Sequence, residues 1–334
     1  MAHNLYHDRA MMFVGDKPWH GLGIEFPANA TYEQIAQAVG FYAVVERQLY
    51  AAGIPEAIPD RKAIVRADTG AYLSTVGIDY GVVQIAEAAR SVLSAMASVA
   101  QSVKGAVFHT AGLLGPNGIR FWLMGELGQP FTVKGYTSEV KRNVLATSAH
   151  DGATAFVLKN VATNVVCQNT VSAALGETGG LFGQKIRHTS NAAQRVQDAA
   201  QGFGKLVDQS RAFEGLANAM ASTEFDRRAF FDTVDALIPV PQDGKPHPKL
   251  DNQRDAIMGL HNASKGGEGL KDNAWSAYQS WTEFADHYIA PELRADRLES
   301  VWFGRGDAVR TKALNTIVDV AGLRPLTQEL GLSA

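Results

Sequence analysis

The sequence predicts an α+β protein, in which a mostly antiparallel twisted sheet is backed by a helix and followed by a helical C-terminal region. Three pairs of strand-like segments between residues 62 and 158 flank turn signals, which is typical of antiparallel hairpins. One amphipathic helical pattern lies between the first and second pair. From Asn191 onward helical patterns replace the strand patterns, so sheet and helices are segregated along the chain.

The chain of 334 residues is long enough for more than one domain. Residues 1–27 are predicted to form an irregular N-terminal arm, because Pro18 and several glycines interrupt any periodicity. We predict an α+β core domain at 28–190 and a mainly helical C-terminal region at 191–334. Within that region, residues 239–248 hold four of the twelve prolines and are predicted to form a loop.

The first elements are a short helix, a strand and a hairpin. Thr31 can cap the helix, Gln34 completes a capping-box pattern and Gly40 supplies the stop. Residues 42–50 have a β-branched centre and suit a strand. Residues 62–66 and 72–77 flank an Asp-Thr-Gly turn signal and predict a hairpin.

A helix and two further hairpins complete the predicted core domain. Apolar residues recur at helical spacing and predict a helix laid on the sheet, namely Val82, Ile85, Ala89, Val92, Met96 and Val99. Residues 106–114 and 119–125 flank a Gly-Pro-Asn-Gly turn, and residues 143–149 and 154–158 flank His150, Asp151 and Gly152. Residues 162–167 are predicted to be one more strand. In the last turn, Asp151 and Gly152 are expected to supply positive φ angles, with the His150 imidazole directed outwards or over the strand.

The C-terminal region is predicted to contain a long alanine-rich helix over 194–211 and a helix with a wide aromatic face. Trp275 and Trp281 belong to two adjoining faces of that second helix, which predicts burial on two sides. The arm side chains Trp19 and Leu22 must pack either on the chain's own core or on a neighbouring subunit. We therefore predict a homo-oligomer with contacts at Trp19, Leu22, Trp275 and Trp281.

Bulk composition excludes several classes of protein. A hydrophobic fraction of 46% with 19% charged residues describes a globular chain with a sizeable core. The net charge of −3 disfavours coating duplex DNA by charge alone, although a local basic groove is compatible with it. The single cysteine allows no intrachain disulfide, and we find neither a secretory signal nor an apolar run of about 18 residues. We expect a cytoplasmic protein without a membrane partner.

Polar chemistry concentrates within about forty residues, which carry His150, Asp151, Cys167, Gln168, Asn169 and His188. Cys167 comes at the predicted end of a strand, before a short predicted helix over 171–175 that Asn169 or Thr170 can cap. A thiol at a helix N-terminus can have a lowered pKa, and a nearby His150 or His188 would make it an activated nucleophile. The alternative is that Cys167 is a small buried hydrophobe at the close of an apolar strand. The spacing matches no zinc pattern, so we predict neither a metal nor a cofactor.

A second interpretation uses the same region for nucleic acid. The region carries several lysines and arginines. If these cations shared one face of the sheet, they would form a groove that binds phosphates, beside which Phe131 or Tyr136 could stack a base. The amides of Gln168 and Asn169 can donate to and accept from base edges, although capping and turn roles are equally open to them. The alternative for the cations is an ordinary solvated sheet face. The predicted contacts are Lys134, Lys141, Arg142, Lys159, Gln168, Asn169, Lys185 and Arg187.

Several motifs together resemble a phage- and plasmid-borne family catalogued as domain of unknown function 932. The resemblance covers nearly the whole chain and rests on residues 11–15 with 18–23, 68–77, 150–152, 166–170, 187–189 and 275–287. It implies a mobile-element protein made in the cytoplasm of a bacterial host. It supplies no catalytic residues, because the family has no assigned activity.

From these observations we predict a single-stranded DNA binding or annealing protein that acts in recombination or replication, and we favour a binding protein over an enzyme without deciding between them. The analogy that mobile elements need such pairing proteins is one of context only. Two alternatives stay open. One is an enzyme with a Cys167–His nucleophile that acts on nucleotides, nucleic acid or a protein. The other is a defence antagonist that binds host proteins.

Overall fold

The computed structural model describes residues 4–15, 22–164, 170–172, 183–243, 245–263, 271–289, 300–302 and 304–332. The chain forms two compact units, each assembled from several segments. Unit 1 comprises 1–128, 144–159 and 183–205, and unit 2 comprises 129–143, 160–182 and 206–334. This division differs from the continuous domains predicted with boundaries after residues 27 and 190. It cuts two long strands, which change unit after Asn143 and after Lys159.

The larger sheet confirms the predicted α+β class with a mostly antiparallel sheet. Its strand order is β11-β10-β9-β7-β6-β1-β2, with β12 paired to β10 and β8 paired to β9. The first two strands run parallel to each other, whereas β1–β6, β6–β7, β8–β9, β10–β11 and β10–β12 are antiparallel pairs. The strands are β1 Met11–Val14, β2 Ile24–Phe26, β6 Ala106–Leu114, β7 Arg120–Leu127, β8 Phe131–Thr132, β9 Glu139–Ala149, β10 Phe156–Asn164, β11 Thr170–Ser172 and β12 Gly183–Ile186.

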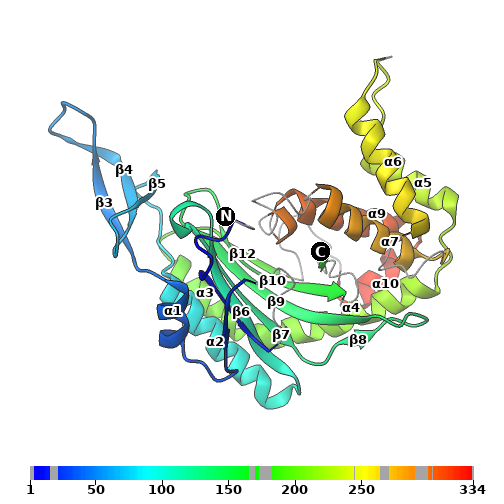
Figure 1. The fold of residues 1–334 in the computed structure, drawn as a ribbon, viewed down its shortest axis with the longest axis horizontal. Helices are drawn as coiled ribbons and strands as arrows, with labels where there is room; N and C mark the ends of the chain where they lie inside the picture. The colour runs from blue at the N-terminus through cyan, green and yellow to red at the C-terminus, as the bar shows by residue number, and fades with distance from the viewer. Residues whose placement is uncertain are drawn as a thin grey trace. The chain divides into compact units, whose positions relative to one another are not determined.

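A separate three-stranded antiparallel sheet lies in unit 1 and contains β3 Val44–Tyr50, β4 Ala57–Arg66 and β5 Tyr72–Gly77. It confirms the first predicted hairpin and the strand before it. The buried side chain of Arg66, at the end of β4, stabilises this sheet. It donates to both carboxylate oxygens of Asp68 at 2.9 and 2.7 Å and to the Asn117 carbonyl at 2.8 Å. The β3–β4 hairpin projects away from the larger sheet of this unit (Figure 1).

Helices of unit 1 follow the local signals closely. In α1, Tyr32–Val39, Thr31 Oγ1 accepts from the Gln34 amide and Gln34 Oε1 accepts from the Thr31 amide, while Gly40 adopts a φ of 81° at the C-cap. The predicted amphipathic helix is α2, Ile85–Ser102, and it packs on β6, β7 and α3. The two helices α2 and α3, Ala192–Gln201, lie on the same face of the sheet (Figure 1). The predicted long helix over 194–211 is thus two helices that meet at Gly202, α3 and α4 Phe203–Ser222.

The helices assigned to unit 2 bury the aromatic residues that the sequence placed on a wide arc. They include α5 Arg227–Leu237, α6 Pro248–Ala263, α7 Ala274–Glu283, the π-helix η3 Phe284–Ile289, α9 Arg305–Val320 and α10 Arg324–Glu329. Trp275 and Trp281 are each only 1% exposed within the core of this unit. The two-sided burial is therefore satisfied by the chain itself. The expectation that these two tryptophans contact a second subunit is wrong, because they present no surface to it.

One ion pair is buried completely inside unit 2. The Arg310 guanidinium on α9 bonds to the Asp286 carboxylate on η3 and to the Val301 carbonyl. Both charged side chains are almost fully inaccessible, at 0% and 2% exposure. Among the described residues, no helix is long and apolar enough to cross a membrane.

Candidate functional site

Of the predicted nucleic-acid contacts in unit 2, the structure describes Lys134, Lys141 and Arg142, and only Lys134 is exposed. Arg142 donates to the carbonyls of Gln129 and Ser210 and to the Glu214 carboxylate at 2.6 Å. Its guanidinium also lies over the Phe131 ring, 4.6 Å from the centroid. Arg142 therefore holds β9 against α4 with its guanidinium already bonded, and its contact with nucleic acid stays a prediction. Lys141 is half-buried with a polar or charged partner of its own, and Lys134 is exposed.

The two aromatic residues expected to stack a base are also buried. Phe131 is 5% exposed and packs edge-on against Phe213. Tyr136 is 6% exposed, and its hydroxyl donates to Asn273 Oδ1 at 2.9 Å. Both rings belong to the core of unit 2, so the expected stacking role is wrong.

Two of the predicted cations, Lys159 and Lys185, lie on the β10–β12 pair of unit 1, and a third, Arg187, comes directly after β12. Lys185 lies directly opposite Val157, and Lys159 follows Val157 by two residues, so Lys159 and Lys185 share one face. Glycine at 183 leaves room for the Lys159 side chain, because a Cβ there would lie 2.8 Å from Lys159 Cβ. Lys159 itself is buried and has a partner. Lys185 and Arg187 are exposed, and neither is within ion-pair distance of a carboxylate in the part of the chain that the structure describes.

His188 forms a second feature of this unit, at the exit of β12. Its Nδ1 lies 3.0 Å from the Gly81 carbonyl and its Nε2 lies 2.8 Å from Ser148 Oγ. Since a carbonyl can only accept, Nδ1 carries the proton in the neutral ring, and Nε2 then accepts from the serine hydroxyl. Burial lowers the pKa of His188, which favours this neutral form. The Tyr80 ring stacks on the imidazole at a centroid distance of 4.7 Å.

The side chain of His150 is fully buried, so the expectation that its imidazole is directed outwards is wrong. Its Nε2 lies 3.1 Å from the Val83 carbonyl, and Nδ1 has no partner among the described residues. Burial lowers the pKa of His150 to about 4, so the ring is neutral at physiological pH. The turn after it uses Gly152, with a φ of 77°, as its left-handed residue, whereas Asp151 lacks the expected positive φ. The Asp151 carboxylate instead accepts from the Ala153 and Thr154 amides.

A cavity of about 450 Å³ lies beside His188 in unit 1. Its lining consists of Asp60, Arg61, Gly77, Ile78, Asp79, Tyr80, His188 and Thr189. Two carboxylates and one guanidinium therefore face the space into which the imidazole opens. Ser148 does not line this cavity and is itself inaccessible to solvent.

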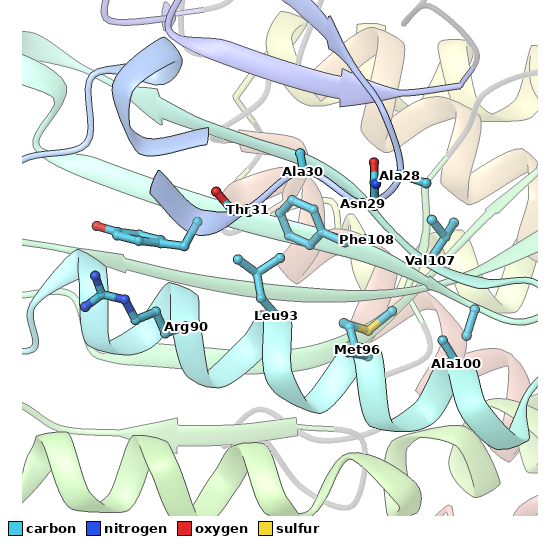
Figure 2. A pocket seen from close by; sticks show the side chains of 13 residues that line it. Ala28, Asn29, Ala30, Thr31, Arg90, Leu93, Met96, Ala100, Val107 and Phe108 are labelled. Carbon is cyan, nitrogen blue, oxygen red and sulfur yellow. The ribbon is translucent and has the colours of Figure 1, made fainter. Parts of the chain in front are cut away.

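A second cavity in unit 1, of about 530 Å³, has a different character. Leu93 and Met96 from α2 and Phe108 from β6 line its apolar part, below the segment that leads into α1 (Figure 2). At one end the Arg90 guanidinium lies over the Tyr32 ring at 4.4 Å and bonds to Glu33 at 3.2 Å. None of the residues predicted as sites lines this cavity.

Several predicted residues lie outside the described residues, namely Trp19, Cys167, Gln168 and Asn169. The proposed pairing of Cys167 with a histidine thus stays a prediction. The short helix expected over 171–175 is wrong in its first part, because Thr170–Ser172 forms strand β11, paired to β10. Leu22 is half-buried and has a partner. Among the described residues, no group of three potential ligands could hold a metal ion.

Sequence reasoning missed Ser148, the partner of His188. A local signal was available, because Ser148 on β9 precedes His150, which comes directly after the strand, by only two positions. No local signal connects either residue with Gly81 or His188, which lie 107 residues apart from each other. The Ser148–His188 contact itself spans 40 residues of sequence.

These features define an α+β chain of two units, with exposed cations beside strand β12 and two histidines in unit 1, of which His150 is buried and His188 is half-buried. The chain belongs to the family described as Domain of unknown function (DUF932), which matches residues 72–314. The match confirms the resemblance seen in the sequence motifs and includes both histidines and the exposed cations. No curated protein and no solved structure matches the chain.

Proposed function

We propose that this protein binds single-stranded nucleic acid, as a step of recombination or replication, through the exposed edge of the β10–β12 pair. The observation that carries the proposal is the pair of exposed cations Lys185, on β12, and Arg187, just after it, neither of which has a carboxylate within ion-pair distance among the described residues. Two positions apart on an extended chain, such side chains are about 6.6 Å apart and face the same side. Contacts of this kind go to phosphates and are therefore tolerant of base sequence.

The net charge of the chain limits the proposed binding surface to this local cluster. The formal net charge is −3, so binding must depend on a local cluster and not on the surface as a whole. Arg142 is excluded from the contacts because Glu214 neutralises it. The contact set is thereby reduced from the predicted one to Lys185 and Arg187, with Lys159 as their buried neighbour.

The proposal predicts a change in the salt dependence of binding to an unstructured oligonucleotide. The double variant Lys185→Ala/Arg187→Ala is expected to bind more weakly at low salt. Its slope of log K against log salt should be shallower by about 0.7 for each lost phosphate contact. Fluorescence anisotropy between low and physiological salt measures both quantities.

A matched control removes two exposed cations elsewhere in unit 1, Arg9→Ala/Lys104→Ala. This variant has the same net charge as the test variant and should keep the wild-type slope. The proposal fails if the wild-type chain does not bind at low salt, or if the two double variants lose affinity equally.

The Ser148–His188 contact favours a second candidate function, acid–base catalysis. A hydroxyl donates to a neutral imidazole whose other nitrogen is oriented by a carbonyl, which is the order of groups in an activated nucleophile. This is an enzyme alternative that uses serine where the sequence suggested Cys167. Ser148 is buried and does not line the cavity, so of these two residues only His188 meets it.

A fluorophosphonate probe tests this second candidate on the full chain. Attack by Ser148 Oγ would form the O–P bond, pass the proton to His188 Nε2 and release fluoride. Mass spectrometry should then locate the adduct on Ser148, and His188→Gln should abolish labelling while circular dichroism stays unchanged. Absence of an adduct on the wild-type chain removes the enzyme candidate and leaves the His188 ring with a structural role, in which it joins Ser148 to Gly81.

A further inference from the structure

Exposed apolar side chains gather on the small sheet of unit 1. Tyr50, Ile54, Tyr72 and Ile78 are each more than half exposed, at 54–56%. All four lie on β3, β5 or the connections directly next to these strands. We name β3, β4 and β5 with their connections, residues 44–78, the arm; this segment is distinct from the N-terminal arm predicted over residues 1–27. Large exposed apolar side chains clustered on one element mark an interaction surface more often than scattered ones do.

The two edges of the arm sheet differ in how they are covered. Along β5, Asn117 Nδ2 donates to the Tyr72 carbonyl at 3.2 Å, and Ser74 Oγ donates to the His150 carbonyl at 2.7 Å. A Cβ added at Gly152 would lie only 3.0 Å from Val76, so that turn also presses on β5. The chain of unit 1 itself therefore protects this edge.

The outer edge of β3 is protected only at its beginning. The Gln84 side chain accepts from the Val44 amide and donates to the Val44 carbonyl, both at 2.9 Å, as a neighbouring strand would. The amide and carbonyl of Val44 point away from β4. Alternate residues of a strand direct these groups to the same side, so the amides and carbonyls of Glu46 and Gln48 also point outward. In the part of the chain that the structure describes, no strand pairs with this side of β3. An unpaired edge beside exposed apolar side chains is a template for another strand.

Charges on the arm argue against a polyanion as the occupant. It carries equal numbers of acids and bases, namely Glu46, Glu56, Asp60 and Asp68 against Arg47, Arg61, Lys62 and Arg66. Lys62 is bonded to Glu46 at 2.8 Å, and Arg61 lies 3.8 Å from Asp60. A surface of this balance offers no positive field to phosphates, and it does not repel a second copy of itself.

We propose that the arm is a self-association surface, at which two copies of this chain pair their β3 edges antiparallel about a two-fold axis. An antiparallel edge is complementary to itself, because each copy offers the same amides and carbonyls that the other needs. Antiparallel pairing brings the hairpin tip with Tyr50 and Ile54 toward the beginning of β3 in the other copy, so that these side chains lose contact with water. This surface takes the place of the predicted oligomer contact through Trp275 and Trp281.

The test is the mass of the full chain in solution without nucleic acid, measured by light scattering and sedimentation. Wild type is expected to be a dimer, and Ile54→Asp is expected to have half that mass because a charge would enter the apolar contact. Gln48→Pro removes one outward amide without touching the β3–β4 ladder and should also give monomers. Val320→Asp, an exposed apolar residue on α9, is the matched control and should remain dimeric.

Circular dichroism must match wild type for each variant, so that a lower mass reports association and not unfolding. A monomeric wild-type chain at tens of micromolar overturns the proposal, and so does a dimer that survives both arm variants. The variant Lys185→Ala/Arg187→Ala should stay dimeric, which separates self-association from nucleic-acid binding. If the arm instead serves a host protein, wild type will be monomeric alone, and the proposal fails by the same measurement.

Discussion

Replacing Arg310 by methionine is expected to lower the free energy of unfolding by about 3–5 kcal/mol. The guanidinium is completely buried and bonds to the Asp286 carboxylate and the Val301 carbonyl. Without it, the carboxylate of Asp286, itself 2% exposed, would be a buried charge with its strongest partner removed. That desolvation penalty exceeds the gain from the apolar methionine side chain. Urea unfolding of the full chain, followed by tryptophan fluorescence, measures the change.

Two companion variants decide whether the ion pair is the cause. Lys312→Met removes a cation from the exposed side of the same helix and should change stability by less than about 0.5 kcal/mol. Arg310→Met/Asp286→Leu removes both charges and should recover most of the loss, because an apolar pair needs no compensation. If the double variant is as unstable as the single one, shape and not charge governs this site, and the argument is wrong.

Arg310 also illustrates the difference between features that the sequence predicts and features that it does not. Elements whose signals are local follow the sequence closely, as the capping box at Thr31 and Gln34 and the left-handed Gly40 show. Such signals lie within one turn of chain, where geometry is set by covalent connection. The partners of Arg310 and Arg142 are 24 and 72 residues away, and nothing local distinguishes these buried cations from exposed ones.

The tryptophans show a different limit of sequence reasoning. A wide aromatic arc correctly indicated that Trp275 and Trp281 are buried on two sides. Periodicity cannot tell whether the second side is covered by the same chain or by another one, because the physical requirement is only removal from water. The exposed apolar side chains of the arm include Tyr50 and Ile54 at the β3–β4 tip, where β4 begins five residues before the predicted strand at 62–66.

The site itself was found in part. The concentration of polar residues drew attention to His150 and His188, and the structure buries the first and bonds the second to Ser148. Burial of His150 was missed because the adjoining Asp-Gly turn suggested solvent. The loops that cover it, carrying Val83 and Tyr42, come from distant parts of the chain.

This burial leads to a strong pH dependence of stability. The pKa of His150 falls from its ordinary 6.5 to about 4 in the folded chain, because burial disfavours the charged ring. Between these values the unfolded chain binds the extra proton and the folded chain does not. Stability is therefore fully present above about pH 6.5 and is lost as the pH falls through 4. Over that window this group removes about 3 kcal/mol from the free energy of unfolding.

The difference between wild type and His150→Gln isolates this contribution. Glutamine can still donate to the Val83 carbonyl but does not titrate, so its stability should fall less between pH 7 and pH 4, by about 3 kcal/mol. Acid titration of carboxylates is common to both proteins and cancels in the difference. His188, whose pKa is lowered in the same direction, remains in both chains. Parallel stability curves for the two proteins would mean that His150 is solvated in the folded chain, contrary to its burial between the rings of Tyr42 and Phe121.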